Sequence, residues 1–172
     1  MLGVLREDFA NKRRIYAADG AQPGPLRLLM SDGSSAMVLY RLMRACARLR
    51  LAPLAWVVQW LNKFVNGCVI GAGADFGPGF VILHPVGIVI NSKVRGGRNV
   101  ALEGGVVIGD EKGRSPEFGD DVFVGSGAKI IGDIVVGNRV KIGANAVVLH
   151  SILDDATVVG IPAKPVTRRE AA

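Results

Sequence analysis

Large apolar side chains return at every sixth position along the second half of the chain. The series begins at Ile70, pauses after Val106 and resumes in the same phase at Phe118. Its thirteen members are Ile70, Phe76, Ile82, Ile88, Val94, Val100, Val106, Phe118, Val124, Ile130, Val136, Ile142 and Val148. Neither the helical period of about 3.6 residues nor the alternation of a strand explains this spacing. A sustained six-residue repeat predicts a parallel β-helix.

The residues around this repeat also fit a tightly wound coil. Glycine, which relieves a tight corner, follows the apolar residue at Gly71, Gly77, Gly119, Gly125, Gly137 and Gly143. Small or branched side chains, which suit closely stacked coils, lie four positions after it at Ala74, Val122, Ala128, Ile134, Val140 and Ala146. The pattern therefore predicts both the corners and the interior of the coil.

One segment, residues 109–117, interrupts the repeat, because none of its nine residues has a large apolar side chain. The step from Val106 to Phe118 is twelve residues, which is two full periods. We therefore expect the coil geometry to continue across the segment and predict that it is an extruded loop. Loops on a rigid scaffold frequently carry function.

The first 66 residues have helical spacing instead, and predict helices over 4–18 and about 35–49 and a third that begins near Pro53. Residues 31–35 supply an N-cap for the second of these. We expect this segment to cover the exposed edge of the first coil. The third helix carries Trp56 and Trp60, for which we favour packing on the end of the β-helix; contact with a partner subunit or a membrane surface is the alternative.

The net charge of +6 lies entirely in this helical segment, where ten lysines and arginines face four acidic residues. Such a segment attracts anionic partners, although a solvated helix face fits equally well. Aromatic and basic residues do not interleave, so no nucleic-acid partner is expected. Two cysteines form no disulfide framework, and neither a signal peptide nor a transmembrane segment is apparent. These features predict a cytoplasmic protein.

The chain has only two histidines, His84 and His150, each two positions after a repeat residue. With Ile82 pointing inward, strand alternation turns His84 toward an external groove. A lone histidine in a β-protein is more often structural than catalytic. No catalytic triad, nucleotide-binding loop or metal-ligand cluster accompanies these residues, and no metal is predicted.

Four ordered segments, however, resemble the hexapeptide-repeat acyltransferases, and in particular their serine acetyltransferase branch. The matching segments are 84–90 (HPVGIVI), 125–132 (GSGAKIIG), 141–144 (KIGA) and 159–164 (VGIPAK), together with Leu5–Asp8 and Tyr40-Arg41 in the helical lead-in. The resemblance implies a left-handed parallel β-helix, a homotrimer or a dimer of trimers, and acetyl-CoA bound in the groove between subunits. The expected parts are a helical cap (1–66), a β-helix acyltransferase domain (67–166) and a C-terminal tail (167–172).

The resemblance also implies roles for individual residues. His84 would be the general base that takes a proton from the acceptor hydroxyl, as an imidazole can at neutral pH. Backbone N–H groups near 104–109 would stabilise the negative oxygen. Coenzyme A would contact Gly109, Ser126, Gly127, Lys141, Ala144 and Lys164. The acceptor would contact Asn91, Glu103, Asp110 and Arg114.

Three departures from the family pattern bear on the acceptor. Leu83 replaces an aspartate before the catalytic histidine, Ser115 replaces the histidine of the loop, and Ser92 replaces an acidic residue. The lost charges would hold the ammonium group of a free amino acid. Relatives encoded with polysaccharide-assembly genes have a similar pattern. We therefore expect a sugar or similar polar acceptor, with serine as the alternative and a non-catalytic β-helix scaffold as a further one.

Overall fold

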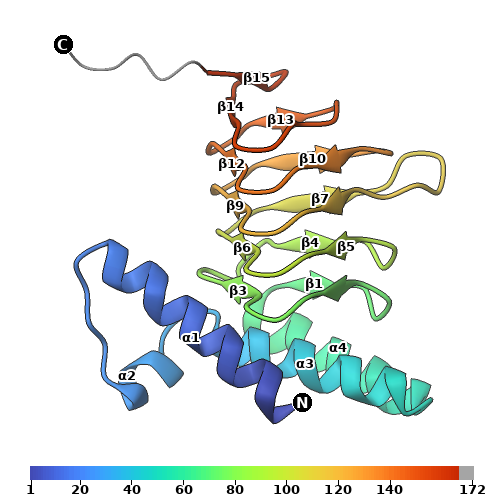
Figure 1. The fold of residues 1–172 in the computed structure, drawn as a ribbon. Helices are drawn as coiled ribbons and strands as arrows, with labels where there is room; N and C mark the ends of the chain where they lie inside the picture. Colours follow the sequence, from blue (N-terminus) through green and yellow to red (C-terminus); the bar gives the residue numbers. More distant parts are fainter. Residues whose placement is uncertain (167–172) are drawn as a thin grey trace.

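The computed structural model describes residues 1–166 and consists of four helices followed by a stack of short strands (Figure 1). The predicted tail, 167–172, lies outside the described residues. The helices are α1 (Leu2–Ala18), α2 (Pro25–Leu29), α3 (Ser34–Arg48) and α4 (Ala52–Asn66). The strands are β1 (Val69–Ile70), β2 (Asp75–Phe76), β3 (Val81–Ile82), β4 (Val89–Ile90), β5 (Arg95–Gly96), β6 (Ala101–Leu102), β7 (Val107–Gly109), β8 (Glu117–Phe118), β9 (Phe123–Val124), β10 (Lys129–Ile131), β11 (Val135–Val136), β12 (Lys141–Ile142), β13 (Val147–Val148), β14 (Thr157–Val159) and β15 (Lys164–Pro165).

The strands form the three faces of a prism, as expected for a β-helix. Sheet A has the order β1-β4-β7-β10-β13, sheet B the order β11-β8-β5-β2, and sheet C the order β15-β14-β12-β9-β6-β3. All pairs of successive coils are parallel, and only β15 folds back antiparallel on β14. The prediction of a left-handed parallel β-helix is confirmed. The chain passes from sheet C to sheet A at one edge, the C–A edge, and from A to B at the next, the A–B edge.

The register differs from the expected uninterrupted phase at two corners. Ile70 pairs with Ile90, twenty residues later, and not with Ile88. The corner between Ile82 and Ile90 therefore takes eight residues in place of six, and the corner between Ile108 and Phe118 takes ten. The two excesses, of two and four residues, add up to one period, so the apolar pattern of the sequence stays in phase although the pairing register shifts twice.

All thirteen repeat residues are nevertheless buried, at 6% exposure or less. Between the two shifts, the repeat residues Ile88, Val94 and Val100 lie two positions before the inward strand residues. In the first coil, the equivalent positions are occupied by Cys68, Ala74 and Phe80. Both kinds of position face the interior of the coil. All residues of the apolar repeat therefore belong to the core, although some lie at the inward strand position and others two residues before it.

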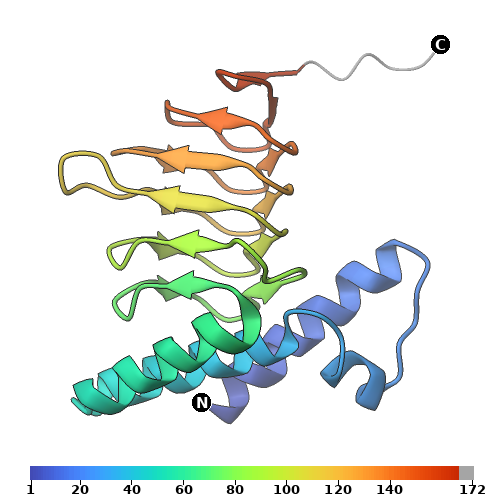
Figure 2. The same cartoon turned by 180° about the vertical axis from the view of Figure 1, so that it is seen from behind.

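The helices lie at one end of the stack, against the first coil (Figures 1 and 2). The hydroxyl of Tyr40, which is fully buried in α3, donates to the carbonyl oxygen of Ala74 at 3.2 Å and accepts the N–H of Phe76 at 3.0 Å. Arg41 and Asp8 form a buried ion pair beside it, with Nε–Oδ2 at 2.7 Å. The motif segments of the helical lead-in thus join α1 and α3 to the β-helix.

The helical predictions agree with the structure except in two details. Helix α3 begins after Gly33, which has no side chain to cap it, so the expected side-chain N-cap is absent from this helix. The side chains of Trp56 and Trp60 are 61% and 47% exposed, so the expectation that they pack on the end of the β-helix is wrong. No helix within residues 1–166 is long and apolar enough to cross a bilayer.

Candidate functional site

His84 lies on the first of the two enlarged corners, where the chain leaves β3 on sheet C and turns toward β4 on sheet A. The two additional residues of this corner lift the imidazole away from the coil, and its side chain is 61% exposed. Gly104 lies next to it in the second coil, where a Cβ atom would come within 3.3 Å of the Cβ of His84. The expectation that His84 faces outward is therefore confirmed.

Two carboxylates flank the imidazole ring. Nδ1 of His84 lies 3.3 Å from Oδ2 of Asp32, and Nε2 lies 4.0 Å from Oε2 of Glu103. Asp32 comes from the connection between α2 and α3, and Glu103 follows β6 in the second coil. A carboxylate at Nδ1 favours the tautomer with the proton on that nitrogen, which leaves Nε2 able to accept one.

Sequence reasoning found Glu103 but missed Asp32, which it assigned to a helix cap. Lys12 holds this segment from below: its ammonium group donates to the carbonyl oxygen of Asp32, to Oγ of Ser34 at 3.0 Å and to the carbonyl oxygen of Ile82 at 3.3 Å. Burial lowers the pKa of Lys12 from 10.5 to about 8, and the charge of Asp32 opposes the shift. No local sequence signal connects three segments so far apart in the chain.

The C–A edge continues above His84 as a column of turns, one in each coil. The N–H of Gly105 donates to the carbonyl of Val86, that of Gly127 to Gly104, and that of Asn145 to Ser126. Three of the residues predicted to bind coenzyme A lie on this edge: Ser126, Gly127 and Ala144. Ser126 and Ala144 are exposed, so the edge offers accessible backbone and small side chains along a line that begins at His84.

The other three predicted coenzyme contacts lie elsewhere. Lys141 begins β12 on the outer face of sheet C and Lys164 begins β15 near the far end of the stack, and both are exposed. Gly109 ends β7 on sheet A, at the A–B edge. One cation that sequence reasoning missed is Lys129, whose Nζ donates to the carbonyl oxygen of Gly105 at 2.7 Å. The structure therefore gathers only part of the predicted set along one edge.

Most of the predicted acceptor contacts lie on a different edge from His84. Asn91 donates to Oδ1 of Asp110 at 2.9 Å and accepts from Ser115 at 3.3 Å, where the chain passes from sheet A to sheet B. Arg114, in the loop 109–117, pairs with Asp133 at 2.5 Å, and the hydrogen bond between them raises the pKa of the guanidinium group. Within one chain, only Glu103 of the predicted acceptor contacts lies beside His84.

His150 does not have the same structural position as His84, contrary to expectation. It follows β13 of sheet A, so it lies on the A–B edge, whereas His84 lies on the C–A edge. The two histidines share only their spacing from the apolar repeat.

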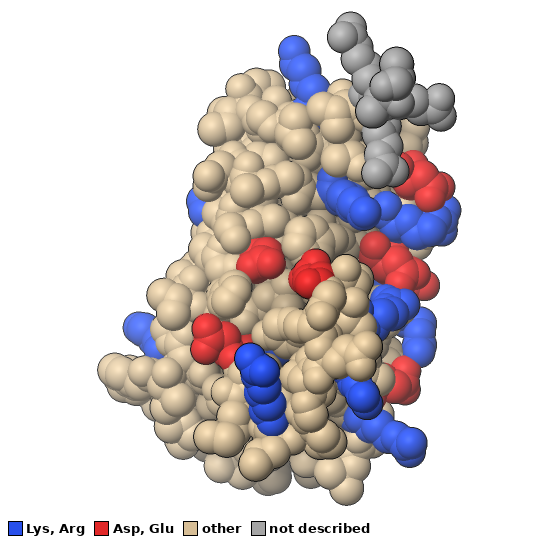
Figure 3. Space-filling view, turned by 90° about the vertical axis from the view of Figure 1, so that its left-hand side faces the viewer, with Lys and Arg blue, Asp and Glu red and all other residues tan. Residues whose placement is uncertain are grey.

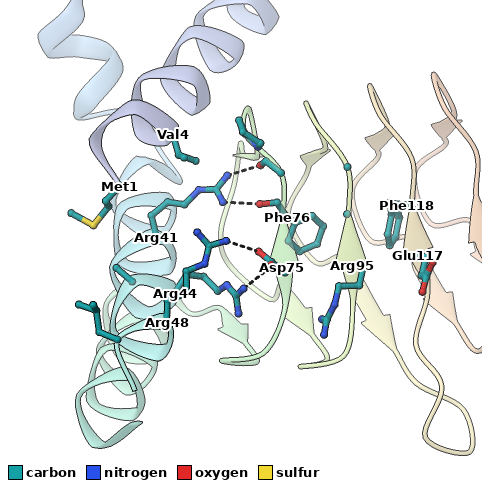
Figure 4. Close-up of a pocket in the computed structure, with 16 residues that line it drawn as sticks. Met1, Val4, Arg41, Arg44, Arg48, Asp75, Phe76, Arg95, Glu117 and Phe118 are labelled. Atoms are coloured by element: carbon teal, nitrogen blue, oxygen red, sulfur yellow. Dashed lines mark hydrogen bonds and ion pairs between the residues drawn. The ribbon is translucent and has the colours of Figure 1, made fainter. Parts of the chain in front are cut away.

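A separate cavity of about 840 Å³ lies between the helices and sheet B (Figure 4). Arg44 and Arg48 extend from α3 into it and meet Asp75 at 2.6 and 3.5 Å, while Phe76 and Phe118 contribute apolar surface. This cavity borders the face opposite the C–A edge, and none of its lining residues is a predicted site residue. It is therefore not part of the His84 site.

The side of the molecule that carries α1, β3, β6 and β9 is shown in Figure 3. A few acidic side chains are scattered over a mostly uncharged central surface, and lysines, arginines and further acidic residues alternate along one margin. Charge on this side is therefore local and mixed in sign.

Comparison with known proteins gives concordant results. The family "Bacterial transferase hexapeptide (six repeats)" matches residues 115–150. Serine acetyltransferase of Helicobacter pylori (strain ATCC 700392 / 26695) is 41% identical over 145 residues, which cover 82% of this chain and 85% of that protein.

Two solved structures share the fold over nearly the whole chain. The serine acetyltransferase of Neisseria gonorrhoeae in complex with serine is 32% identical, with a TM-score of 0.86, and the match covers 96% of this chain and 68% of that one. A serine acetyltransferase in complex with CoA is 31% identical, with a TM-score of 0.86, and the match covers 95% and 68%. The chain therefore belongs to the serine acetyltransferase family of hexapeptide-repeat acyltransferases, and it is an acyltransferase.

Proposed function

We propose that this protein transfers an acetyl group from acetyl-CoA to the hydroxyl of L-serine, with His84 as the general base. The observation that carries this proposal is the imidazole on the enlarged C–A corner, with a carboxylate near each ring nitrogen. Family membership supports the acetyl donor, because the related serine acetyltransferase of known structure was obtained as a complex with CoA. The proposal revises the preference for a sugar acceptor, since the matched relatives are named serine acetyltransferases.

The chemistry at His84 is a proton transfer. Nε2 takes the proton of the acceptor hydroxyl as its oxygen forms a bond to the thioester carbonyl carbon, and the carbon–sulfur bond then breaks. The proton returns from the imidazolium to the departing thiolate. The carboxylate of Asp32, 3.3 Å from Nδ1, orients the ring and stabilises its positive charge in between. A positioned base of this kind contributes on the order of 10²–10⁴ in rate.

The C–A edge provides a path for the coenzyme arm. Its turns expose backbone at Ser126 and Ala144, which leaves room for an extended chain to lie beside the stack. Lys141 and Lys164 lie farther along the stack, and we assign them to the coenzyme phosphates, which cations commonly bind. The N–H of Gly104 is the nearest candidate for binding the carbonyl oxygen, because Gly104 lies against His84 and the N–H of Gly105 already donates to Val86.

A homotrimer would explain why predicted site residues lie on two edges. The loop 109–117 extends from the A–B edge, so in one chain it does not reach His84. In an assembly around a threefold axis, the A–B edge of one subunit can face the C–A edge of the next, which would place Arg114 beside a neighbouring imidazole. The cytoplasmic location stays part of this proposal, and it is consistent with Cys46 and Cys68, which are both free and buried.

Serine binding needs one anionic and one cationic partner. Glu103, whose side chain is 22% exposed and lies 4.0 Å from Nε2 of His84, can pair with the ammonium group. Arg114 is the candidate for the carboxylate, but its pairing with Asp133 favours a second possibility. If that ion pair persists, Arg114 is not available to the carboxylate of serine, and a sugar hydroxyl becomes the better acceptor.

The test measures release of the coenzyme thiol with L-serine and with a panel of sugars as separate acceptors. We expect saturable turnover with L-serine, a reduction in kcat on the order of 10²–10⁴ for His84→Ala, and unchanged turnover for His150→Ala as the matched control. Turnover only with sugars would support the second possibility. Equal turnover by His84→Ala and wild type would refute the role of the imidazole, and bound acetyl-CoA without turnover on any acceptor would indicate a non-catalytic scaffold.

A further inference from the structure

Helix α4 is amphipathic, but its large apolar side chains face outward and its buried face contains two asparagines, the reverse of an ordinary surface helix. Its buried positions are Ala55, Val58, Asn62 and Asn66. Its outer face consists of Trp56, Val57, Trp60, Leu61, Phe64 and Val65, whose exposures range from 47% to 66%. We call these six side chains the α4 apolar face. An ordinary surface helix turns its large apolar residues inward, because burial of such residues stabilises the fold.

A buried amide network fixes this orientation. Asn66 Nδ2 donates to Oδ1 of Asn62 at 2.9 Å, and Asn62 Nδ2 donates to the carbonyl oxygen of Ala36 in α3 at 3.3 Å. Ser35 donates to Oδ1 of Asn66 at 2.6 Å. Rotation of α4 to bury its tryptophans would expose or break these hydrogen bonds, and unpaired buried amides are costly. The apolar face is therefore held outward by the fold itself.

The aromatic side chains of this face form a continuous row. The ring centroids of Trp56 and Trp60 are 5.9 Å apart and those of Trp60 and Phe64 are 4.7 Å apart. Lys63 lies over the ring of Trp60, with Nζ 5.9 Å from the centroid. A contiguous exposed patch of this kind marks an interaction site rather than ordinary surface.

The charged side chains of α3 and α4 and of the turn between them have a single sign, although Arg41 pairs with Asp8 and Arg44 and Arg48 pair with Asp75. Residues 33–74 contain five cations (Arg41, Arg44, Arg48, Arg50 and Lys63) and no aspartate or glutamate. Within residues 1–166, neither Arg50 nor Lys63 lies within 4 Å of a carboxylate from elsewhere in the chain. A partner that offers both apolar volume and negative charge would therefore complement this face.

We propose that the α4 apolar face docks on the surface of an anionic lipid bilayer. Tryptophan and phenylalanine rings insert at the level of the lipid headgroups, and Lys63 and Arg50 meet lipid phosphates. All four helices lie at one end of the stack of coils, so a surface can contact α4 while the coils extend away from that end (Figures 1 and 2). The active corner and the loop 109–117 remain accessible in this orientation.

A second copy of the chain fits the face less well. In a symmetric contact each subunit would place its own Lys63 and Arg50 against the same cations of its partner, and residues 33–74 offer no carboxylate to pair with them. Like charges opposed in an interface cost free energy. An anionic bilayer supplies the missing negative charge over its whole surface.

Tryptophan emission gives a direct test, because the only two tryptophans of the sequence lie on this face. Full-length protein is mixed with vesicles of phosphatidylcholine alone, or of phosphatidylcholine and phosphatidylglycerol in equal parts, and binding is followed by flotation and by emission wavelength. We expect binding to the mixed vesicles, a shift of emission to shorter wavelength, and weakening by added salt.

Two variants and two matched controls separate the contributions. Leu61→Ser with Phe64→Ser should lower the partition coefficient at least about tenfold through lost apolar transfer. Lys63→Glu should lower it about fivefold or more through lost attraction to the anionic surface. Leu153→Ser and Arg139→Glu, at the opposite end of the stack, change an exposed leucine and an exposed cation and should leave binding unchanged.

Three results would overturn the proposal. The first is no flotation of the wild type with mixed vesicles at low ionic strength. The second is equal binding by the Leu61→Ser/Phe64→Ser variant and the wild type. The third is a decrease in oligomer size for that variant in sedimentation velocity without lipid, which would assign the face to a second copy. Acetyl transfer in solution is measured in parallel and should be unaffected by the α4 substitutions, so this test is independent of the proposed function.

Discussion

The buried ion pair between Asp8 and Arg41 should be the most sensitive point in the attachment of the helices to the β-helix. Asp8 accepts two hydrogen bonds from Arg41, at 2.7 and 2.8 Å, and one from the N–H of Gly79 at 2.8 Å. Arg41 also donates to the carbonyl oxygens of Phe76 and Gly77 at 2.8 and 2.7 Å. The side chains of Asp8 and Arg41 are only 1% and 8% exposed. The pair thus joins α1, α3 and the corner after β2.

Replacement of Asp8 by alanine leaves a buried guanidinium group without its counter-charge and the N–H of Gly79 without an acceptor. Loss of one partner of a buried pair costs about 3–5 kcal/mol. For a chain of this size, about 2–4 °C of melting temperature corresponds to each kcal/mol, so we expect a decrease of about 6–20 °C. Because an uncompensated charge dominates the effect, Asp8→Ala combined with Arg41→Met should lose less than the sum of the single variants.

The assay is thermal unfolding followed by circular dichroism at one fixed protein concentration, since association makes melting temperatures depend on concentration. Arg139→Met is the matched control, because Arg139 makes an equally well-formed bidentate pair with Asp155 on the exposed surface, at 2.6 and 2.8 Å. A surface pair of this kind contributes little. The reasoning would be refuted if Asp8→Ala and Arg139→Met lowered the melting temperature equally, or if the Asp8 and Arg41 effects were additive.

Three further predictions concern single residues near the junction of helices and coils. Burial lowers the pKa of Lys12 to about 8, so between about pH 8 and 10.5 the unfolded chain binds more protons at this residue than the folded chain does. The stability of the wild type should therefore rise relative to that of Lys12→Met through that window. A constant difference in melting temperature across the window would contradict the shift. Burial raises the pKa of the Cys68 thiol to about 12, so alkylation at pH 8 should require unfolding, and rapid labelling of native protein would disprove this. Gly33→Ala should destabilise far more than Gly20→Ala: both have positive φ, which costs about 1–3 kcal/mol, but a Cβ at Gly33 would also overlap the carbonyl of Ile82, whereas Gly20 has open space. Equal melting temperatures for the two would show that the loop before α3 can move.

Much of the fold was predictable because the apolar repeat reports burial directly. Every repeat residue is buried, and the predicted bounds of α1 and α3 and the predicted start of α4 are within a few residues of the observed ones, whereas the short helix α2 was not predicted. The contacts of the site were not predictable in the same way. Asp32 and His84 are separated by 52 positions, and nothing in the spacing of either residue indicates that the loop before α3 reaches the first corner. Lys12 joins them from a third segment, where its cation looked like part of a solvated helix face.

The prediction that the tryptophans of α4 pack on the β-helix was wrong for a different reason. Sequence reasoning assumes that large apolar residues are buried and amides are exposed, and α4 reverses both assignments. The buried asparagines could have been the signal, because Asn62 and Asn66 are four residues apart and therefore share one helix face. Their partners, Ser35 and the carbonyl of Ala36, are visible only in three dimensions.

The two enlarged corners are also the two places to which function was assigned. His84 lies on the corner with two additional residues, and the loop 109–117 lies on the corner with four. The sequence pattern hid both departures for two reasons. The two and the four additional residues add up to one period, which restores the phase. The interior of a β-helix also accepts Val or Ile both at the strand position and at the position two residues earlier. Val94 and Val100 are buried at this earlier position, as Ala74 and Phe80 are in the first coil. A regular coil supplies rigidity everywhere, whereas an enlarged corner provides the space in which a side chain can stand clear of its neighbours and meet a substrate. In such a repeat, the pairing register locates the candidate site more sharply than the apolar comb that specifies the fold.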